Sequence, residues 1–207
     1  MAEHLKVDRY GDFWLTDAIR PAQDLTVVPS QGYRIDVYRD PNANFSVPVL
    51  AASISREKLF DVFLDLLESL GEVVDVVLET SHNSTGGNPH LDLFREAMDL
   101  PVLKSHCCDY ENLLLNDGCT GIAVMSTEGP MEVQFDEHKL LVVYAPKLKP
   151  FEAVMREHRI ARQDSMKLIT EGEHLHSTDE THRASFEEMC YRLGVGKAFE
   201  RVGSNDW

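Results

Sequence analysis

Two stretches of this chain carry histidine and glutamate at matching positions. One begins at Glu79 and the other at Glu171, and a shift of 92 positions superposes them. Five residue types then coincide, in the pairs Glu79–Glu171, His82–His174, His90–His182, Phe94–Phe186 and Glu96–Glu188. Glutamate and histidine are metal ligands in proteins. The match therefore raises three alternatives: a duplicated active site that binds a metal, a duplicated fold, or a chance coincidence in a His-rich acidic protein.

The second stretch has more candidate ligands, namely Glu171, His174, His176 and His182. A strand end, a loop and the first turn of a helix could bring them around one ion. Three protein ligands and an open position form the arrangement of catalytic zinc sites. Each residue also has a structural explanation: His174 and His176 share a strand face, and His182 lies one turn before Phe186. The HExxH spacing is absent.

A second candidate site is the segment Ser84, Thr85, Gly86, Gly87 and Asn88, which precedes an expected helix. Free backbone N–H groups and the helix dipole favour an anion at such a position. The segment contains neither the Walker lysine nor the GxGxxG pattern, so nucleotide binding is disfavoured. The alternative is a connection in which glycine supplies positive φ angles.

The four cysteines indicate no further site. Cys107 and Cys108 are adjacent, whereas Cys119 and Cys190 are isolated. This pattern is neither a disulfide framework nor a CxxC zinc site, and the role of the adjacent pair is left open. No GxSxG nucleophile motif is present either.

The charge balance disfavours two classes of partner. The 207 residues include 20 basic and 35 acidic residues, a net charge of -15. Nucleic acids and anionic membrane surfaces both require clustered basic residues, so neither is an expected partner. No apolar run reaches a membrane-spanning length, and the N-terminal residues lack a signal-peptide layout. These features predict a cytoplasmic protein.

The apolar pattern of the first half predicts three strands, a helix, a strand and a helix. The strands are expected at 11–17, 33–40 and 45–53, with the last two forming a hairpin. A helix should follow from Ser55 to Gly71, with Leu59, Phe63 and Leu66 on its apolar face. Residues 73–80 predict a strand buried on both faces, and residues 89–99 a helix with Asn88 as its cap.

The second half has a similar predicted order. A short helix capped by Asp109 precedes three strands at 120–126, 131–137 and 139–145 and a helix at 149–162. A strand at 166–170 is expected to turn back through Glu171 and Gly172 into a strand at 173–177. A helix from 178 to 193 should follow, with Ser177 and Glu180 at the spacing of a capping box.

The expected fold class is therefore α+β, with two tandem similar halves that arose by internal duplication. Each half would have the order (α)βββαβ(β)α, with a mainly antiparallel sheet and helices packed on it. The halves are residues 1–108 and 109–207. They form either two domains or one compact pseudo-symmetric unit.

The order of elements is similar to that of type III secretion chaperones, which are small, acidic cytoplasmic proteins that dimerise and hold partner segments. The likeness covers topology and acidity, without a sequence motif. It implies a non-enzymatic module that binds a protein or peptide, as a monomer or homodimer and without a cofactor. The alternative is a metal-dependent hydrolase that uses the Glu-His-His cluster of the C-terminal half, with zinc or another divalent metal.

Overall fold

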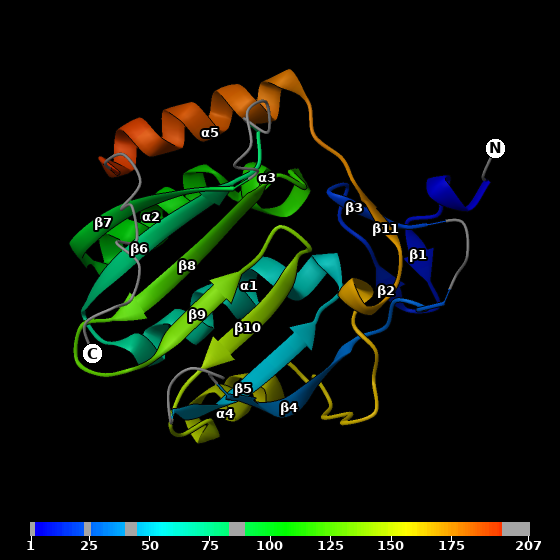
Figure 1. Cartoon of the computed structure of the whole chain (residues 1–207), viewed down its shortest axis with the longest axis horizontal. Coiled ribbons are helices and arrows are strands. Elements are labelled where there is room, and N and C mark those ends of the chain that lie inside the picture. The colour runs from blue at the N-terminus through cyan, green and yellow to red at the C-terminus, as the bar shows by residue number, and fades with distance from the viewer. Residues whose placement is uncertain (1–2, 23–25, 40–44, 83–89, 196–207) are drawn as a thin grey trace.

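A computed structural model describes residues 3–22, 26–39, 45–82 and 90–195 of the chain. Its centre is a seven-stranded antiparallel sheet with the order β4-β5-β10-β9-β8-β6-β7 (Figure 1). The strands are β4 (Gly32–Arg39), β5 (Ser46–Ser53), β6 (Val73–Thr80), β7 (Leu91–Asp99), β8 (Thr120–Ser126), β9 (Glu132–Phe135) and β10 (Leu140–Tyr144). The expected α+β class, with a mainly antiparallel sheet and helices packed on it, is confirmed.

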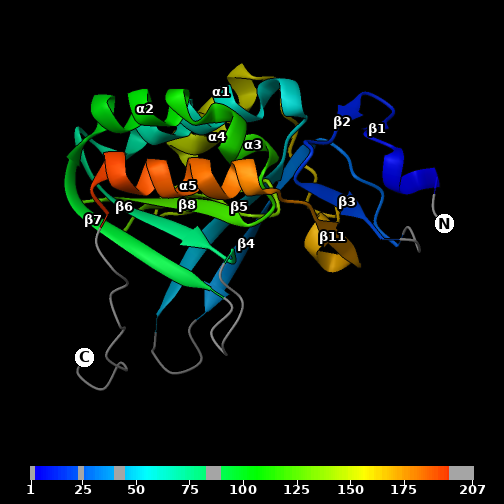
Figure 2. The ribbon, with the colours of Figure 1, turned by 90° about the horizontal axis from the view of Figure 1, so that it is seen from above.

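The helices gather on one side of this sheet (Figure 2). They are α1 (Arg56–Leu67), α2 (Leu100–Asp109), α3 (Glu111–Asn116), α4 (Lys149–Glu157) and α5 (Glu180–Leu193). Strand β6 shows the consequence, because Val74, Val76 and Leu78 are buried whereas Val73 and Val77 on the opposite face are partly exposed. The expectation that this strand is buried on both faces is wrong.

Helix α1 forms the centre of the core, as its apolar spacing predicts. Leu59, Phe63 and Leu66 are almost fully buried against the sheet. The Phe63 ring lies 5.2 Å from the Phe135 ring of β9, measured between centroids. After a short 3-10 turn, Gly71 ends the segment at φ 108°, a conformation that favours glycine.

Several predicted elements are confirmed at nearly their expected positions. Strands β4 and β5 pair in antiparallel register as the expected hairpin. Strands β8, β9 and β10 follow one another in the sheet, and α4 comes after them. Helix α5 ends at Gly194, whose φ of 64° is the left-handed cap.

The helix expected at 89–99 is wrong, because residues 91–99 form the edge strand β7. Leu91, Phe94 and Met98 fit a helical spacing, but the same segment also alternates, with Asp92 and Glu96 on the face of Phe94. Antiparallel pairing with β6 supplies backbone hydrogen bonds that favour the strand over the helix. Helix α2 follows, over residues 100–109, where a connection was expected.

The fold does not show the expected duplication. Phe94 lies on a strand, whereas its matched residue Phe186 is buried on helix α5. The central sheet takes β4 to β7 from residues 1–108 and β8 to β10 from residues 109–207. The division into two halves at residue 108 stays a prediction.

Two short ribbons lie together at one end of the sheet (Figure 1). Strand β1 (Arg9–Tyr10) pairs with β2 (Phe13–Trp14), and β3 (Ile19–Pro21) pairs with β11 (His174–His176). The strand expected at 11–17 thus shrinks to two residues. The strand expected at 166–170 is wrong, since its end joins a 3-10 turn, Ile169–Glu171. Met166, Leu168 and Ile169 instead pack on Leu140 of the central sheet.

Two expected helix caps also require correction. The backbone N–H of His182 donates to the Asp179 side chain, so Asp179 caps α5 in place of Ser177. A carboxylate at this position satisfies a free N–H group and interacts well with the helix dipole. Asp109 is the last residue of α2, and Tyr110 precedes α3.

Three backbone segments come close together at Gly118, and this crossing attaches β3 and β11 to the sheet. The Gly118 N–H donates to the Ser177 carbonyl at 2.8 Å, and the Ser177 N–H donates to the Ala18 carbonyl at 2.8 Å. A Cβ atom at residue 118 would lie 2.5 Å from the Ala18 oxygen. The crossing therefore requires glycine.

We predict that Gly118→Ala lowers the free energy of unfolding by about 2 kcal/mol, because the backbone must move apart to admit the methyl group. Urea denaturation measures the change. Gly129→Ala is the matched control, since a Cβ there meets nothing within 4 Å. Equal stability of the two variants would contradict the prediction.

Candidate metal centre

Three histidine side chains meet where the β3–β11 ribbon contacts the central sheet. His138 lies in the turn between β9 and β10, and His174 and His176 lie on β11. The ring of His138 is 4.9 Å from that of His174 and 4.8 Å from that of His176, and the last two rings are 5.2 Å apart. One ligand atom from each residue lies within 4.8 Å of the others. We call these three residues the His centre.

The local folds account for this meeting. His174 and His176 are two positions apart on a strand, so their side chains share a face. On the other side, Asp136 shapes the turn, because its carboxylate accepts the Leu140 N–H at 2.8 Å and its carbonyl accepts the Lys139 N–H. The turn and the strand then place the three rings together.

Hydrogen bonds set the tautomer of each ring. The Nδ1 atoms of His174 and His176 lie 2.8 Å and 2.6 Å from the carbonyl oxygens of Gly172 and Gly118. A carbonyl can only accept, so both Nδ1 atoms carry hydrogen, and in a neutral ring Nε2 keeps the lone pair. His138 Nδ1 faces the Asp136 carboxylate at 3.1 Å, which favours the same tautomer. Metal-binding histidines typically have such a partner on the second nitrogen.

The electrostatic environment differs among the rings. Burial acts to lower the pKa of His138, but the hydrogen bond and charge of Asp136, with help from Glu137, raise it above the ordinary value. Burial, followed by the charges of His138 and His174, lowers the pKa of His176. Asp136 and Glu137 therefore favour a positive charge at His138. His176 remains neutral to a lower pH, which keeps its lone pair available.

A buried lysine stands next to the centre. Lys139 Nζ donates to the Thr120 carbonyl at 2.8 Å and lies 5.4 Å from the centre of the Phe135 ring. Burial lowers the pKa of Lys139 to about 8, although the negative charges of Asp136 and Asp117 act to raise it. Its ammonium group contacts the Thr120 carbonyl and the Phe135 ring in the core beside the centre.

The candidate ligands taken from the sequence separate in the structure. His174 and His176 come together, whereas Glu171 forms an ion pair with Arg34. His182 lies at the start of α5, with Nδ1 3.4 Å from the Asp179 carboxylate. Ser84, Thr85, Gly86, Gly87 and Asn88 lie outside the described residues. The sequence prediction did not include His138, which lies in the turn between two expected strands and meets β11 only through the fold.

A second group, His82, Asp117 and Cys119, has a structural role. Asp117 is fully buried, and its Oδ2 atom lies 2.8 Å from His82 Nε2 and accepts the Thr120 hydroxyl. Its Oδ1 atom accepts the Cys119 N–H at 3.3 Å. Both oxygens are thus occupied by hydrogen bonds, and the group fixes the segment that leads into Gly118.

The adjacent cysteines differ in their surroundings. Cys107 is buried on α2, and burial raises the pKa of its thiol to about 12. Cys108 is exposed. All four cysteines are free, and the buried thiol has a very small thiolate fraction at neutral pH.

The sheet face opposite the helices has two grooves that share Met125, Glu132 and Gln134. One has a volume of about 320 Å³, and it is lined also by Val77, Glu79, Asp92, Phe94, Glu96 and Ala123. The other has a volume of about 590 Å³, and Tyr38, Phe45, Val47 and Tyr144 are among its lining residues. Burial, and then the charges of Asp92 and other acidic groups, raise the pKa of Glu79 to about 7. We call this surface the open face.

Comparisons with known proteins leave the family open, because no protein-family model, curated protein or solved structure matches the chain. Within the described ranges, no helix is both long enough and apolar enough to cross a membrane. Functional inference therefore rests on the geometry of the sites.

We predict that, in metal-free protein, His138 titrates above the ordinary histidine pKa and His176 below it, because Asp136 stabilises the first imidazolium and burial disfavours the second. Histidine ring signals followed by NMR across pH 5 to 9 measure both values. Asp136→Asn keeps the shape of the side chain and should lower the pKa of His138. An unchanged His138 pKa in that variant would contradict the role of Asp136.

Proposed function

We propose that this protein binds a divalent transition metal ion, with zinc as the best match, through His138, His174 and His176. The observation that carries this proposal is the hydrogen bonding of all three Nδ1 atoms to oxygens, within a group whose ligand atoms lie within 4.8 Å of one another. These hydrogen bonds leave the Nε2 lone pair of each ring as the one that can bind an ion.

The ligand type selects the ion. Imidazole nitrogen suits zinc and its neighbours in the transition series, whereas magnesium and calcium prefer oxygen ligands. Nitrogens around one tetrahedral zinc at about 2 Å lie roughly 3.3 Å apart. The three ligand atoms would therefore close by up to about 1.5 Å from their present limit of 4.8 Å.

The ion would join two parts of the fold. His174 and His176 belong to the β3–β11 ribbon, whereas His138 belongs to the central sheet. His176 is exposed, so the fourth position of the ion would face solvent and take water. The metal would thus hold the ribbon on the sheet, since it binds the folded protein and not the unfolded chain.

The alternative of a hydrolase has less support from the surroundings of the His centre. His138 borders a cavity of about 20 Å³, room for roughly one water molecule, and neither His174 nor His176 lines that cavity. A hydrolase for small molecules needs a much larger space beside the ion. The geometry therefore supports metal binding better than hydrolysis of a small substrate.

We predict that zinc binds in a 1:1 ratio and that His138→Ala or His176→Ala weakens binding at least 100-fold, because two imidazoles hold the ion poorly. Isothermal titration calorimetry on untagged, metal-free protein measures this. Affinity should also fall at least about tenfold per pH unit below pH 7, as protons compete for the imidazoles, first at His138.

Three variants test whether zinc binds at the His centre or at another group of side chains. His182→Ala and Glu171→Gln remove the candidates that the structure places elsewhere, and His158→Ala removes a histidine that bonds Asp65 on α1. All three should keep the zinc affinity of the parent protein. Loss of binding in His182→Ala with retention in His138→Ala would overturn the proposal.

The open face supports a second candidate function, the binding of a protein or peptide segment. Its two grooves combine apolar side chains with carboxylates, and Tyr38 and Phe45 are each about half exposed at one margin. Exposed apolar surface with an acidic border fits an amphipathic basic segment. This function needs no metal and is compatible with the metal site.

We predict that an amphipathic Leu–Lys peptide of about 18 residues binds the open face and that a Leu–Glu peptide of the same length does not. Met125→Lys should weaken Leu–Lys binding at least tenfold, because it places a cation between the two grooves. Val28→Lys is the control, since Val28 is exposed but borders neither groove. Fluorescence anisotropy of a labelled peptide gives both affinities, and equal affinities for the two variants would refute this function.

A further inference from the structure

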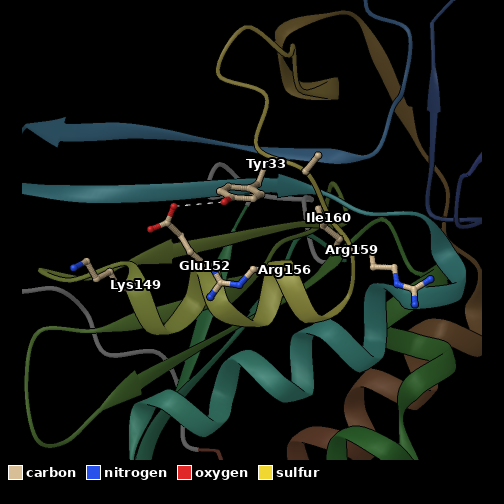
Figure 3. A pocket seen from close by; sticks show the side chains of 7 residues that line it. Tyr33, Lys149, Glu152, Arg156, Arg159 and Ile160 are labelled. Atoms are coloured by element: carbon tan, nitrogen blue, oxygen red, sulfur yellow. Dashed lines mark hydrogen bonds between the residues drawn. The ribbon is translucent and has the colours of Figure 1, made fainter.

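Helix α4 presents a row of charged side chains to a cavity of about 690 Å³ (Figure 3). Lys149, Glu152 and Arg156 follow one another at spacings of three and four residues, so they lie along one side of the helix, and Arg159 continues the row two residues after the helix ends at Glu157. The buried residues Phe151 and Met155 occupy the opposite side. Tyr33 of strand β4 forms the facing wall of the cavity, with Ile160 and Ala161.

The three cations of this row are available for a ligand. Within the described ranges, the side chains of Lys149, Arg156 and Arg159 form no ion pair or hydrogen bond with one another or with other described residues. The single carboxylate, Glu152, accepts the Tyr33 hydroxyl at 3.4 Å and lies 3.8 Å from an Arg162 nitrogen. Its charge is therefore partly neutralised by a residue outside the row.

The lining of this cavity is positively charged, whereas the protein as a whole is negatively charged. Its lining carries three cations and one anion, whereas the chain has a net charge of -15. A concave surface of one sign concentrates ligands of the opposite sign. Its volume is also within the range of small-molecule sites, roughly 300 to 1,000 Å³.

The backbone gives a further indication. Arg159 follows the end of α4 with a φ of 58°, in the left-handed region where glycine is the usual residue. An arginine at this position costs conformational free energy. The strained residue supplies one of the three cations of the cavity, as expected where a side chain has a binding role.

We propose that this cavity, the α4 cavity, binds a small multivalent anion, in the class of organic phosphates and polycarboxylates. Arginine and lysine recognise both groups through charge-assisted hydrogen bonds. Figure 3 shows Lys149 and Arg159 toward opposite ends of the helix, with Arg156 between them. Arg156 therefore occupies the middle of the row, and several anionic groups on one ligand match this row better than a single charge does.

Pyrophosphate and citrate are the two probes, one for each source of anionic charge. Calorimetric titration is done at low salt on metal-free His138→Ala protein, so that the His centre contributes no bound metal. At least one probe should bind in a 1:1 ratio. Arg156→Gln in this background should weaken that binding at least tenfold, and Glu152→Gln should strengthen it several-fold by removing the carboxylate from the row.

Lys6→Gln is the matched control, because it removes one exposed positive charge outside the α4 cavity. It should leave the affinity within about twofold of the parent value. Thermal unfolding of each variant verifies that the fold is kept. The proposal is overturned if neither probe binds at millimolar concentration, or if Lys6→Gln and Arg156→Gln lose equal affinity. Tighter binding by pyrophosphate assigns the cavity to phosphates, and tighter binding by citrate assigns it to carboxylates.

Discussion

The pairing of β11 with β3 is the interaction on which the candidate metal centre depends. These strands join residues 174–176 to residues 19–21, and the hydrogen bonds at Gly118 then fix both strands to the segment that leads into β8. The same glycine supplies the carbonyl that orients His176. The backbone hydrogen bonds around Gly118 thus stabilise the β3–β11 ribbon and also set the tautomer of His176. A metal ion would add a link between the ribbon and the sheet beside the apolar cluster that Ile19 and Leu140 share.

A second constraint comes from the one-sided packing of the sheet. Because the helices cover a single face, the other face presents alternate residues of every central strand to the surface. Met166 and Ile169 cover one end of that face, while the remainder forms the acidic grooves. The ionised form of Glu79 is disfavoured on this face, since burial among like charges raises its pKa to about 7. Such a carboxylate is poised to exchange its proton for a cationic group.

The sequence predicted much of the fold, because local periodicity decides most of it. The α1 helix, the β4–β5 hairpin and strands β8 to β10 follow directly from apolar spacing. The spacing of Leu91, Phe94 and Met98 favours a helix at the place of strand β7, and only the pairing with strand β6 shows that the segment is extended. The prediction of the His centre was incomplete for a similar reason. The alternation along the strand indicates His174 and His176, but His138 joins them only because the fold brings the β9–β10 turn against β11, and no local pattern contains that contact.

We propose that three imidazole nitrogens, from two separate parts of the fold, bind one zinc ion. ¹⁵N NMR of the histidine side chains, as zinc is added to metal-free protein, measures this binding at each ring. The Nε2 signals of His138, His174 and His176 should shift together and saturate at one equivalent of zinc, while those of His182 and His158 stay in place. Saturation with no change at His138 would contradict it.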